Sequence, residues 1–445
     1  MKSPQASFIL AFSLSLSPLL SRAETAKSCE SPSGSLPEAV QSEKKRALRN
    51  KDTGAEVETQ SVSAKINGQE IPVKYQKYPA PVRPAKGTIL FLCGGPGFPC
   101  TEGGRPGHLP PEYDVVTLDY LGIGQNRAHN EPGQMSIDAQ AQAVEAIARQ
   151  IKAPHLVIYG HSFGTTVATA AASKLTNPAA TPKVALKSVV LEGVVGHGGQ
   201  EPYGRGHLQV AEEAWKMLTP KEQKDFTAAY KKYTAKMTAS QKLDVDYYLT
   251  ESLLGGPLEA IDALLSFATY PEDVPEKVQR TKDFLEKAKT SEGLRLYRAA
   301  GCQILGQAGA VPATKIMGGQ VTLAVGQMPG EPGYCDCPLL SKLWDPSEYQ
   351  IQGVPVLYIN GHQDAATPYA WAETHLRSQT KASQKVMLAP ELGGHSETMT
   401  GGMAYCTDEI FDRVFSGQLA LLKTREKTLS RGRCSGRSQP ASGQQ

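Results

Sequence analysis

Residues 160–164 read GHSFG, a pattern that could present a nucleophile. The apolar, β-prone run 155–159 precedes it, and residues 165–172, rich in Ala and Thr, follow it. Where a buried strand turns sharply into a helix, the middle serine stands at a strained tip, and glycines on either side avoid collisions. The first N–H groups of such a helix would face a developing negative charge. Ser162 is therefore the predicted nucleophile.

A serine nucleophile needs a histidine as base and a carboxylate that orients it. In a strand–turn–helix architecture of this kind, the order along the chain is Ser, then Asp or Glu, then His. Asp364 follows the apolar run 354–359, and His395 follows the run 385–388 and a Gly-Gly pair. Because sites form where parallel strands end, these positions predict a triad of Ser162, Asp364 and His395.

Other residues compete for these roles. Asp364 could simply cap a helix that begins near Pro368, and Glu391 is the alternative acid. His395 could be an ordinary loop histidine, and the alternative bases are His161, His362 and His375. The required order, with the acid and the base each placed after a buried strand, favours the triad.

The glycine-rich turn 93–97, CGGPG, predicts the binding site for the oxyanion. It follows the apolar run 88–92, and glycine lets the backbone approach a substrate carbonyl closely. Pro96 has no N–H, so the expected donors are the N–H groups of Gly95 and of Phe163, which follows the nucleophile. An ordinary Gly-Pro turn is the alternative.

The elements that must position these residues follow from the hydrophobic pattern. Two alternating runs flank Asn67 and Gly68 and predict an antiparallel hairpin. Continuously apolar runs predict strands buried on both faces of a parallel sheet; they are 88–92, 115–118, 156–159, 188–191, 354–359 and 385–388. Apolar residues recur at helical spacing over 137–151, after Ser136 as an expected N-cap. This alternation predicts an α/β fold with a mostly parallel sheet and an antiparallel N-terminal hairpin.

The chain divides into five predicted segments. Residues 1–23 combine Lys2, an apolar stretch and small residues before a possible cleavage site, which is typical of a secretory signal peptide. A polar arm, 24–55, leads into a core made of 56–197 and 350–422. The insertion 198–349 is expected to form a helical cap or lid, with helices over 208–218, 222–237 and 278–288. Thr407 is expected to cap the last helix, and 423–445 to be a basic, disordered tail.

Charge and cysteines limit the partners and the compartment. Without residues 1–23 the chain has 45 basic and 44 acidic residues, so neither nucleic acid nor an anionic membrane is an expected partner. An even number of cysteines in an exported protein, periplasmic or extracellular, predicts disulfides. The favoured pairs are Cys93 with Cys100, and Cys406 with Cys434. Cys335 and Cys337 are too close in sequence for most zinc sites, and neither a metal nor a cofactor is expected.

Several motifs resemble the α/β-hydrolase superfamily over about 57–200 and 350–422 and, within it, the proline iminopeptidase family and related secreted aminopeptidases. They are Gly94-Gly95-Pro96-Gly97, residues 119–124 (DYLGIG), the Ser162 turn, residues 361–368 around Asp364, and Gly394-His395-Ser396. The resemblance implies the triad, a helical cap and release of N-terminal residues from peptides without a metal. Cys93 stands where that family usually has His, and Tyr120-Leu121 where it has Gln-Arg.

That family holds the free amine of the substrate with acidic residues of its cap. The candidates here are Glu212, Glu213 and Glu251, although a solvated helix face would explain them too. An apolar pocket would instead indicate a carboxylesterase or lipase that uses the same triad on small esters. The third alternative is a non-catalytic protein of this fold that binds a ligand.

Overall fold

The computed structural model describes residues 57–102, 104–197, 204–288, 291–305, 312–323 and 342–434 of the chain. The predicted signal peptide (1–23) and polar arm (24–55) lie outside the described residues. So do Cys29, Cys335 and Cys337. Within the described ranges, no helix combines the length and the apolar character that crossing a membrane requires.

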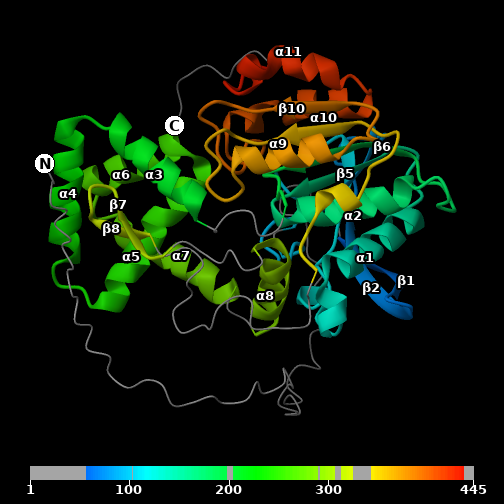
Figure 1. Cartoon of the computed structure of the whole chain (residues 1–445), viewed down its shortest axis with the longest axis horizontal. Helices are drawn as coiled ribbons and strands as arrows, with labels where there is room; N and C mark the ends of the chain where they lie inside the picture. Colours follow the sequence, from blue (N-terminus) through cyan, green and yellow to red (C-terminus); the bar gives the residue numbers. More distant parts are fainter. Residues whose placement is uncertain are drawn as a thin grey trace, which may run out of the picture. The chain divides into compact units, whose positions relative to one another are not determined.

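Eight strands form one sheet in the order β1-β2-β4-β3-β5-β6-β9-β10 (Figure 1). They are β1 (Glu58–Ile66), β2 (Gln69–Tyr78), β3 (Gly87–Leu92), β4 (Tyr113–Thr117), β5 (Leu156–His161), β6 (Leu186–Glu192), β9 (Val356–Ile359) and β10 (Lys385–Leu388). Strand β2 is antiparallel to both of its neighbours, and the strands from β4 to β10 run parallel. The predicted fold, a mostly parallel sheet with an N-terminal hairpin, is confirmed.

The hairpin turn has the residues that its geometry demands. Asn67 and Gly68 adopt φ values of 50° and 89°, both in the left-handed region. Two-residue hairpin turns of this type match the twist of the strands, and Asn-Gly is the sequence that adopts them most readily. The turn sets Ile66 opposite Gln69 and Val62 opposite Val73.

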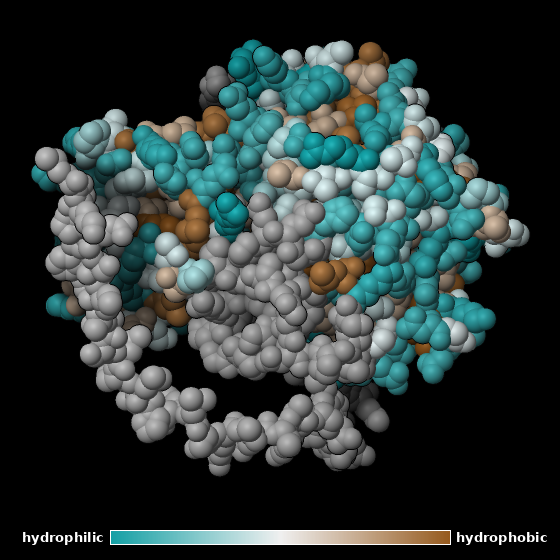
Figure 2. Space-filling model, in the orientation of Figure 1, coloured by the Kyte–Doolittle hydropathy of each residue, from teal (hydrophilic) through white to brown (hydrophobic). Residues whose placement is uncertain are grey.

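Helices cover both faces of the sheet. Because successive side chains of a strand point to opposite faces, Ile158 of β5 joins one hydrophobic cluster and Tyr159 joins the other. Helices α1 (Ile137–Gln150) and α2 (Phe163–Thr176) pack in the first cluster, and α10 (Thr407–Phe415) and α11 (Leu419–Leu429) pack in the second (Figure 1). On the face drawn in Figure 2, hydrophobic residues form only small areas among hydrophilic ones.

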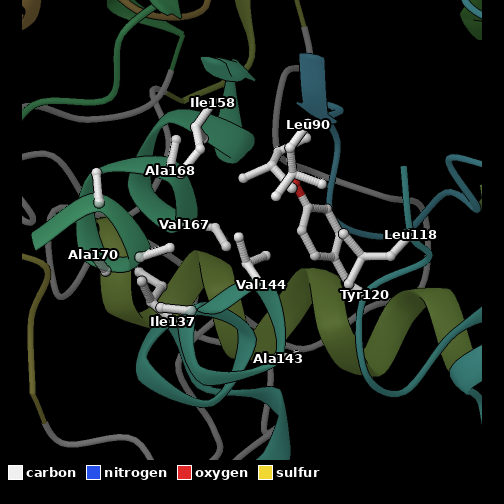
Figure 3. Close-up of a cluster of buried hydrophobic side chains, with 14 of the residues drawn as sticks. Leu90, Leu118, Tyr120, Ile137, Ala143, Val144, Ile158, Val167, Ala168 and Ala170 are labelled. Carbon is white, nitrogen blue, oxygen red and sulfur yellow. The ribbon is translucent and has the colours of Figure 1, made fainter. Parts of the chain in front are cut away.

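Small side chains bring α1 and α2 close to the sheet. Figure 3 shows Ala143 and Val144 of α1 beside Val167 of α2, with Tyr120 directed towards Leu90 of β3. All of these side chains are buried. The Tyr120 hydroxyl donates a hydrogen bond of 2.7 Å to the carbonyl of Cys93, so this cluster also fixes the turn that follows β3.

The insertion carries a hydrophobic cluster of its own. It contains α3 (Arg205–Met217), α4 (Pro220–Thr234), α5 (Ala239–Glu251), α6 (Pro257–Thr269), α7 (Val274–Ala288) and a small hairpin of β7 (Thr314–Ile316) and β8 (Val321–Leu323). The helices predicted over 208–218, 222–237 and 278–288 correspond to α3, α4 and α7. We call residues 204–288 and 312–323 the cap.

The boundary between cap and core differs from the prediction. Helix α8 (Ser291–Leu305) lies within the predicted cap segment, but its residues Leu296, Ala299 and Ala300 belong to the core cluster. The Gln303 side chain also accepts a hydrogen bond of 3.0 Å from the N–H of Ile137, at the start of α1. No helix was predicted over 291–305, and the end of the strand pattern placed this stretch in the insertion without showing which hydrophobic cluster it would join.

The C-terminal helices also correct two predictions. Thr407 is the first residue of α10 rather than its cap, and α11 follows as the last helix. Helix α11 extends through residue 423, where a disordered tail was expected, because Leu422 and Leu429 are buried against the sheet. The many basic residues hid this apolar face. The rest of the tail, 435–445, lies outside the described residues.

The capping of the N-terminus of α1 by Ser136 can be tested directly. The hydroxyl of Ser136 accepts a hydrogen bond of 3.2 Å from the N–H of Ala139, as the sequence predicted. Replacing Ser136→Ala removes this acceptor, so we expect the free energy of unfolding to fall by about 1 kcal/mol in urea titrations. Ser136→Asn keeps a capping oxygen and should lose much less. Equal losses for the two variants would contradict a capping role.

Candidate active site

Ser162 lies in a strained turn between β5 and α2. Its φ of 53° and ψ of −123° fall in a backbone region that residues other than glycine rarely adopt, at a typical cost of about 1–3 kcal/mol. The Ser162 N–H donates to the carbonyl of Glu192 at 2.8 Å, and the Ser162 carbonyl accepts from the N–H of Thr165 at 2.9 Å. The strand–turn–helix predicted around Ser162 is therefore present, and both main-chain groups of the serine are bonded.

The glycines of the turn are required by close packing. A Cβ atom at Gly164 would lie 2.1 Å from the carbonyl oxygen of Leu92, at the end of β3. One at Gly160 would lie 2.4 Å from the carbonyl oxygen of Gly164, and one at Gly94 would lie 2.7 Å from the Cβ of Ser162. No side chain fits at these three positions without movement of the backbone.

This packing gives a prediction for stability. Gly164→Ala forces α2 away from β3, so we expect a loss of at least about 3 kcal/mol or a failure to fold, measured by thermal and urea unfolding. Gly107→Ala is the matched control, because a Cβ atom there meets nothing within 4 Å. A Gly164→Ala variant as stable as the Gly107→Ala variant would contradict the close approach.

Asp364 and His395 form a buried pair at the ends of β9 and β10. The Nδ1 atom of His395 lies 2.9 Å and 3.0 Å from the two carboxylate oxygens of Asp364. Both residues are buried. With Nδ1 donating its proton to the carboxylate, Nε2 of the neutral imidazole is left unprotonated and can act as a base.

The carboxylate of Asp364 is itself held in place. One of its oxygens accepts from the N–H groups of Ala366 and Thr367 at 2.9 Å and 2.8 Å. The other accepts from the Thr367 hydroxyl at 2.6 Å. Asp364 therefore organises the turn before α9 (Tyr369–Ser378) and binds the histidine as well, but it does not cap the helix, whose N-cap is Pro368 without a side-chain bond.

The surroundings of His395 favour its charged form. Burial by itself lowers the pKa of the imidazole, but the Asp364 carboxylate outweighs this effect, and Glu192 and Glu251 act in the same direction. The pKa of His395 is therefore raised above its usual range. A raised pKa makes the neutral imidazole a stronger base.

The cap holds the loop of His395 through the backbone. The His395 N–H donates at 2.7 Å to the carbonyl of Leu254, in the short 3-10 helix η4 (Ser252–Gly255) of the cap. A Cβ atom at Gly394 would lie 2.3 Å from the carbonyl carbon of Gly255. The cap is thus in direct contact with the histidine loop.

The turn after β3 lies beside Ser162. Gly94 is in contact with the serine side chain, and Gly95 has a φ of 54° in the left-handed region. Phe163 is the first residue of α2, where the N–H groups have no acceptor within the helix. The cysteines that bracket the turn, Cys93 and Cys100, lie at disulfide distance, as do Cys406 and Cys434 at the C-terminal end.

The three acidic residues singled out in the cap have different environments. Glu212 pairs with Lys216 at 2.7 Å, and their side chains are 67% and 62% exposed, so this acid belongs to a solvated helix face. Glu213, on the same helix, is partly buried. Glu251 ends α5 and interacts electrostatically with His395, and burial raises its pKa. Glu251 is therefore the one of the three whose charge acts on the histidine.

The alternative acid and bases have other surroundings. The His375 ring bonds to the hydroxyls of Tyr358 and Thr169 at 3.1 Å and 3.0 Å, and burial lowers its pKa to about 3. The His362 ring lies 4.0 Å from that of Tyr369. Glu391 is exposed. Of the alternative bases, all among the described residues, His161 alone is shown beside His395: its Nε2 lies 3.1 Å from the Ser396 hydroxyl, and its ring lies 5.0 Å from that of His395.

Some residues of the site were not singled out from the sequence. Thr367 bonds to both members of the acid–base pair, and Glu192 bonds to the turn of Ser162. Glu192 directly follows the apolar run 188–191, and an acid at the end of a buried strand is a signal that could have identified it. The Leu254 carbonyl leaves no such signal. Among the described residues, no group of three or more His, Cys, Asp or Glu side chains is arranged to hold a metal ion.

A family model described as the alpha/beta hydrolase fold matches residues 87–395, well over half of the chain. This chain belongs to that family. Comparison with the curated proteins finds no match. Solved structures with a similar fold include a thermophilic esterase from Thermogutta terrifontis, with 14% identity over 80% of this chain and 99% of that one and a TM-score of 0.42.

Two further solved structures are similar to this alpha/beta hydrolase to the same degree. An esterase from Exiguobacterium antarcticum has 13% identity over 80% of this chain and 99% of its own, with a TM-score of 0.42. A serine hydrolase from Cycloclasticus zankles has 16% identity over 81% of this chain and 99% of its own, with a TM-score of 0.44.

Proposed function

We propose that this alpha/beta hydrolase is an exported serine hydrolase that works through an acyl-enzyme, and that it releases N-terminal residues from peptides as the proline iminopeptidases do. The position of Glu251 carries this proposal. It is a partly buried acid of the cap whose charge interacts with His395, the proposed base. Export is supported by two cysteine pairs at disulfide distance, which suit an oxidising compartment.

The proposed reaction has two halves. In the first, the hydroxyl of Ser162 attacks the carbonyl carbon of the substrate, and Nε2 of His395 takes the hydroxyl proton and gives it to the leaving amine. Asp364 holds the imidazole in the required tautomer and stabilises its charged form. In the second half, water replaces the serine as the nucleophile, and His395 again moves the proton.

The negative charge on the substrate oxygen needs donors that are already in place. The N–H groups of Gly95 and Phe163 are the proposed pair. Gly94 lies against the serine, and the positive φ of Gly95 turns the loop there without a side chain in the way. Phe163 adds the partial positive charge of the N-terminus of α2.

Glu251 suits a substrate with a free amine. Burying a carboxylate is costly, and burial raises the pKa of Glu251 even though a hydrogen bond with Tyr247 and the charge of His395 act in the opposite direction. A substrate ammonium group would pair with it. In a peptide only the α-carbon separates the ammonium group from the first carbonyl. An acid that binds this ammonium group near His395 would therefore place the first peptide bond at Ser162. The carboxylesterase alternative gives no role to this buried acid.

The nucleophile is tested by replacing Ser162→Ala. Without the hydroxyl no acyl-enzyme can form, so kcat should fall by at least about 10⁴-fold. The melting temperature should stay close to that of the wild type or rise, because alanine removes no hydrogen bond that holds the fold. Turnover and reaction with a fluorophosphonate reagent are the measurements. A Ser162→Ala variant with wild-type turnover would refute the mechanism.

The substrate class is tested on Glu251→Gln. The wild type should cleave a prolyl or alanyl anilide with a free amine in preference to its N-acetylated form. The variant should lose about 10- to 100-fold in kcat/KM on the free-amine substrate, because one charge-assisted contact is lost, and should change little on the acetylated one. Glu212→Gln, an exposed acid of the same cap, is the control.

The two readings of the site predict different outcomes in this experiment. If short acyl esters turn over while neither anilide does, and Glu251→Gln has no effect, the carboxylesterase alternative holds. If no substrate of either class turns over and the fluorophosphonate does not react, the non-catalytic alternative becomes the one to pursue.

A further inference from the structure

Glu192 is a buried carboxylate that the proposed reaction does not use. It ends β6, and only 1% of its surface is exposed. A carboxylate in such a place is costly unless hydrogen-bond donors surround it. Its two oxygens accept from the N–H of Thr398 at 2.7 Å and from the Thr398 hydroxyl at 2.6 Å. The Tyr159 hydroxyl of β5 also donates to it.

These bonds reach the loop that carries the histidine. Thr398 is three residues after His395, and both belong to the segment between β10 and α10. The Tyr159 hydroxyl lies 2.7 Å from that of Thr398, so the acid, the tyrosine and the threonine form a closed group of contacts. The loop is thereby attached to the ends of two central strands of the sheet.

The main chain at the same position contacts the nucleophile and the base. The carbonyl of Glu192 accepts from the N–H of Ser162 at 2.8 Å. The next residue, Gly193, has a φ of 60°, and a Cβ atom there would lie 2.7 Å from Cε1 and 2.9 Å from Nδ1 of His395. The end of β6 therefore contacts the turn of the serine, the imidazole ring and the loop behind the ring.

We propose that Glu192 is a positioning residue for catalysis, which holds the histidine loop so that the imidazole stays between Asp364 and Ser162. The inference rests on the proposed roles of Ser162 and His395. Glu192 itself contacts neither the serine hydroxyl nor the imidazole through its side chain. Its effect comes through Thr398, whose main chain and hydroxyl it binds.

The loop needs such an attachment because of its sequence. Residues 389–401 contain no helix or strand, and a Gly-Gly pair directly precedes His395. The cap carbonyl of Leu254 holds the histidine N–H on one side, and Glu397 holds the N–H of Gly394 at 2.8 Å within the loop. Glu192 adds a contact from the sheet. Displacements of about 1 Å in a catalytic group can cost about 100-fold in rate.

The primary test is Glu192→Gln. An amide has the shape of the carboxylate, but it carries no charge and its NH₂ group donates, so the two charge-assisted bonds from the Thr398 and Tyr159 hydroxyls to that position are lost or reversed. We expect kcat to fall by about 10- to 100-fold while KM changes less than about twofold. Thr398→Val should also lower kcat, whereas Thr398→Ser, which keeps the hydroxyl, should retain most of the rate. The double variant Glu192→Gln/Thr398→Val should lose little more than Glu192→Gln alone, because both changes break the same contact.

Asp246→Asn is the matched control for burial. Asp246 is a buried acid of the cap that accepts from the Tyr230 hydroxyl and from the N–H of Thr322, the same kind of surroundings as Glu192. The control should lower the melting temperature and leave kcat close to that of the wild type. If Asp246→Asn loses as much kcat as Glu192→Gln, the loss comes from destabilisation by any buried amide and not from the position of Glu192, which would overturn the proposal.

A second readout does not depend on turnover. The proton between His395 and Asp364 can be followed by low-field ¹H NMR in the Ser162→Ala background as the pH is changed. The charged or titratable groups that act on this histidine are Asp364, Glu192, Glu251, His161 and His207, and Glu397 in the same loop acts on Glu192 and Asp364. Removing the negative charge of Glu192 removes one contribution that raises the pKa of His395, so the titration midpoint should move to lower pH.

The outcomes separate this inference from the proposed function. If Glu192→Gln keeps the wild-type kcat and the wild-type NMR midpoint, the positioning role is wrong even when Ser162 proves to be the nucleophile. If Ser162→Ala remains active, the proposed function fails, and the NMR titration still tests the coupling of Glu192 to His395. Should Glu192→Gln not fold, an unchanged kcat in Thr398→Val would overturn the role.

Discussion

The close approach of α2 to the end of β3 is the constraint on which the site depends. The carbonyl of Leu92 occupies the space that a side chain at Gly164 would need. This contact lets the chain reverse at Ser162, with its φ of 53°, and brings the turn after β3 against the serine. The parallel strands then end at one edge, so the end of β6 and the segment after β10 contact the serine turn, and the segment after β9 contacts His395. A fold without this approach would have no place where these segments converge.

The electrostatics of the site follow from burial. Asp364 carries three hydrogen bonds from its own turn in addition to His395, so its charge is compensated before any substrate arrives. The histidine is then surrounded by further acids, Glu192 from the sheet and Glu251 from the cap. Several carboxylates close together in a buried site repel one another when they are ionised. A positive group placed among them relieves this repulsion, so the site favours one. The imidazolium formed during the reaction, or an ammonium group of the substrate, would supply it.

Local patterns predicted most of the fold and the contact between Asp364 and His395, because strands and tight turns are encoded over short stretches and the ends of parallel strands meet at one edge. Residues 291–305, which form α8, were assigned to the cap and not predicted as a helix, and their apolar residues do not reveal which cluster they join. The same holds for the cap acids: Glu212 and Glu251 look alike in sequence, and only the path of the chain carries Glu251 to His395. Backbone contacts such as that of the Leu254 carbonyl have no signature in residue type at all.

The cap acts on the site through more than its side chains. Glu251 is three residues before Leu254, whose carbonyl holds the main chain of His395, so the group proposed to bind the substrate amine and the group that fixes the base belong to one short segment. Glycines at 255 and 394 let the two backbones touch. A cap that swung open would break the hydrogen bond to His395 and disturb the base. In the proposed mechanism, substrate recognition and placement of the base therefore depend on the same contact between cap and core.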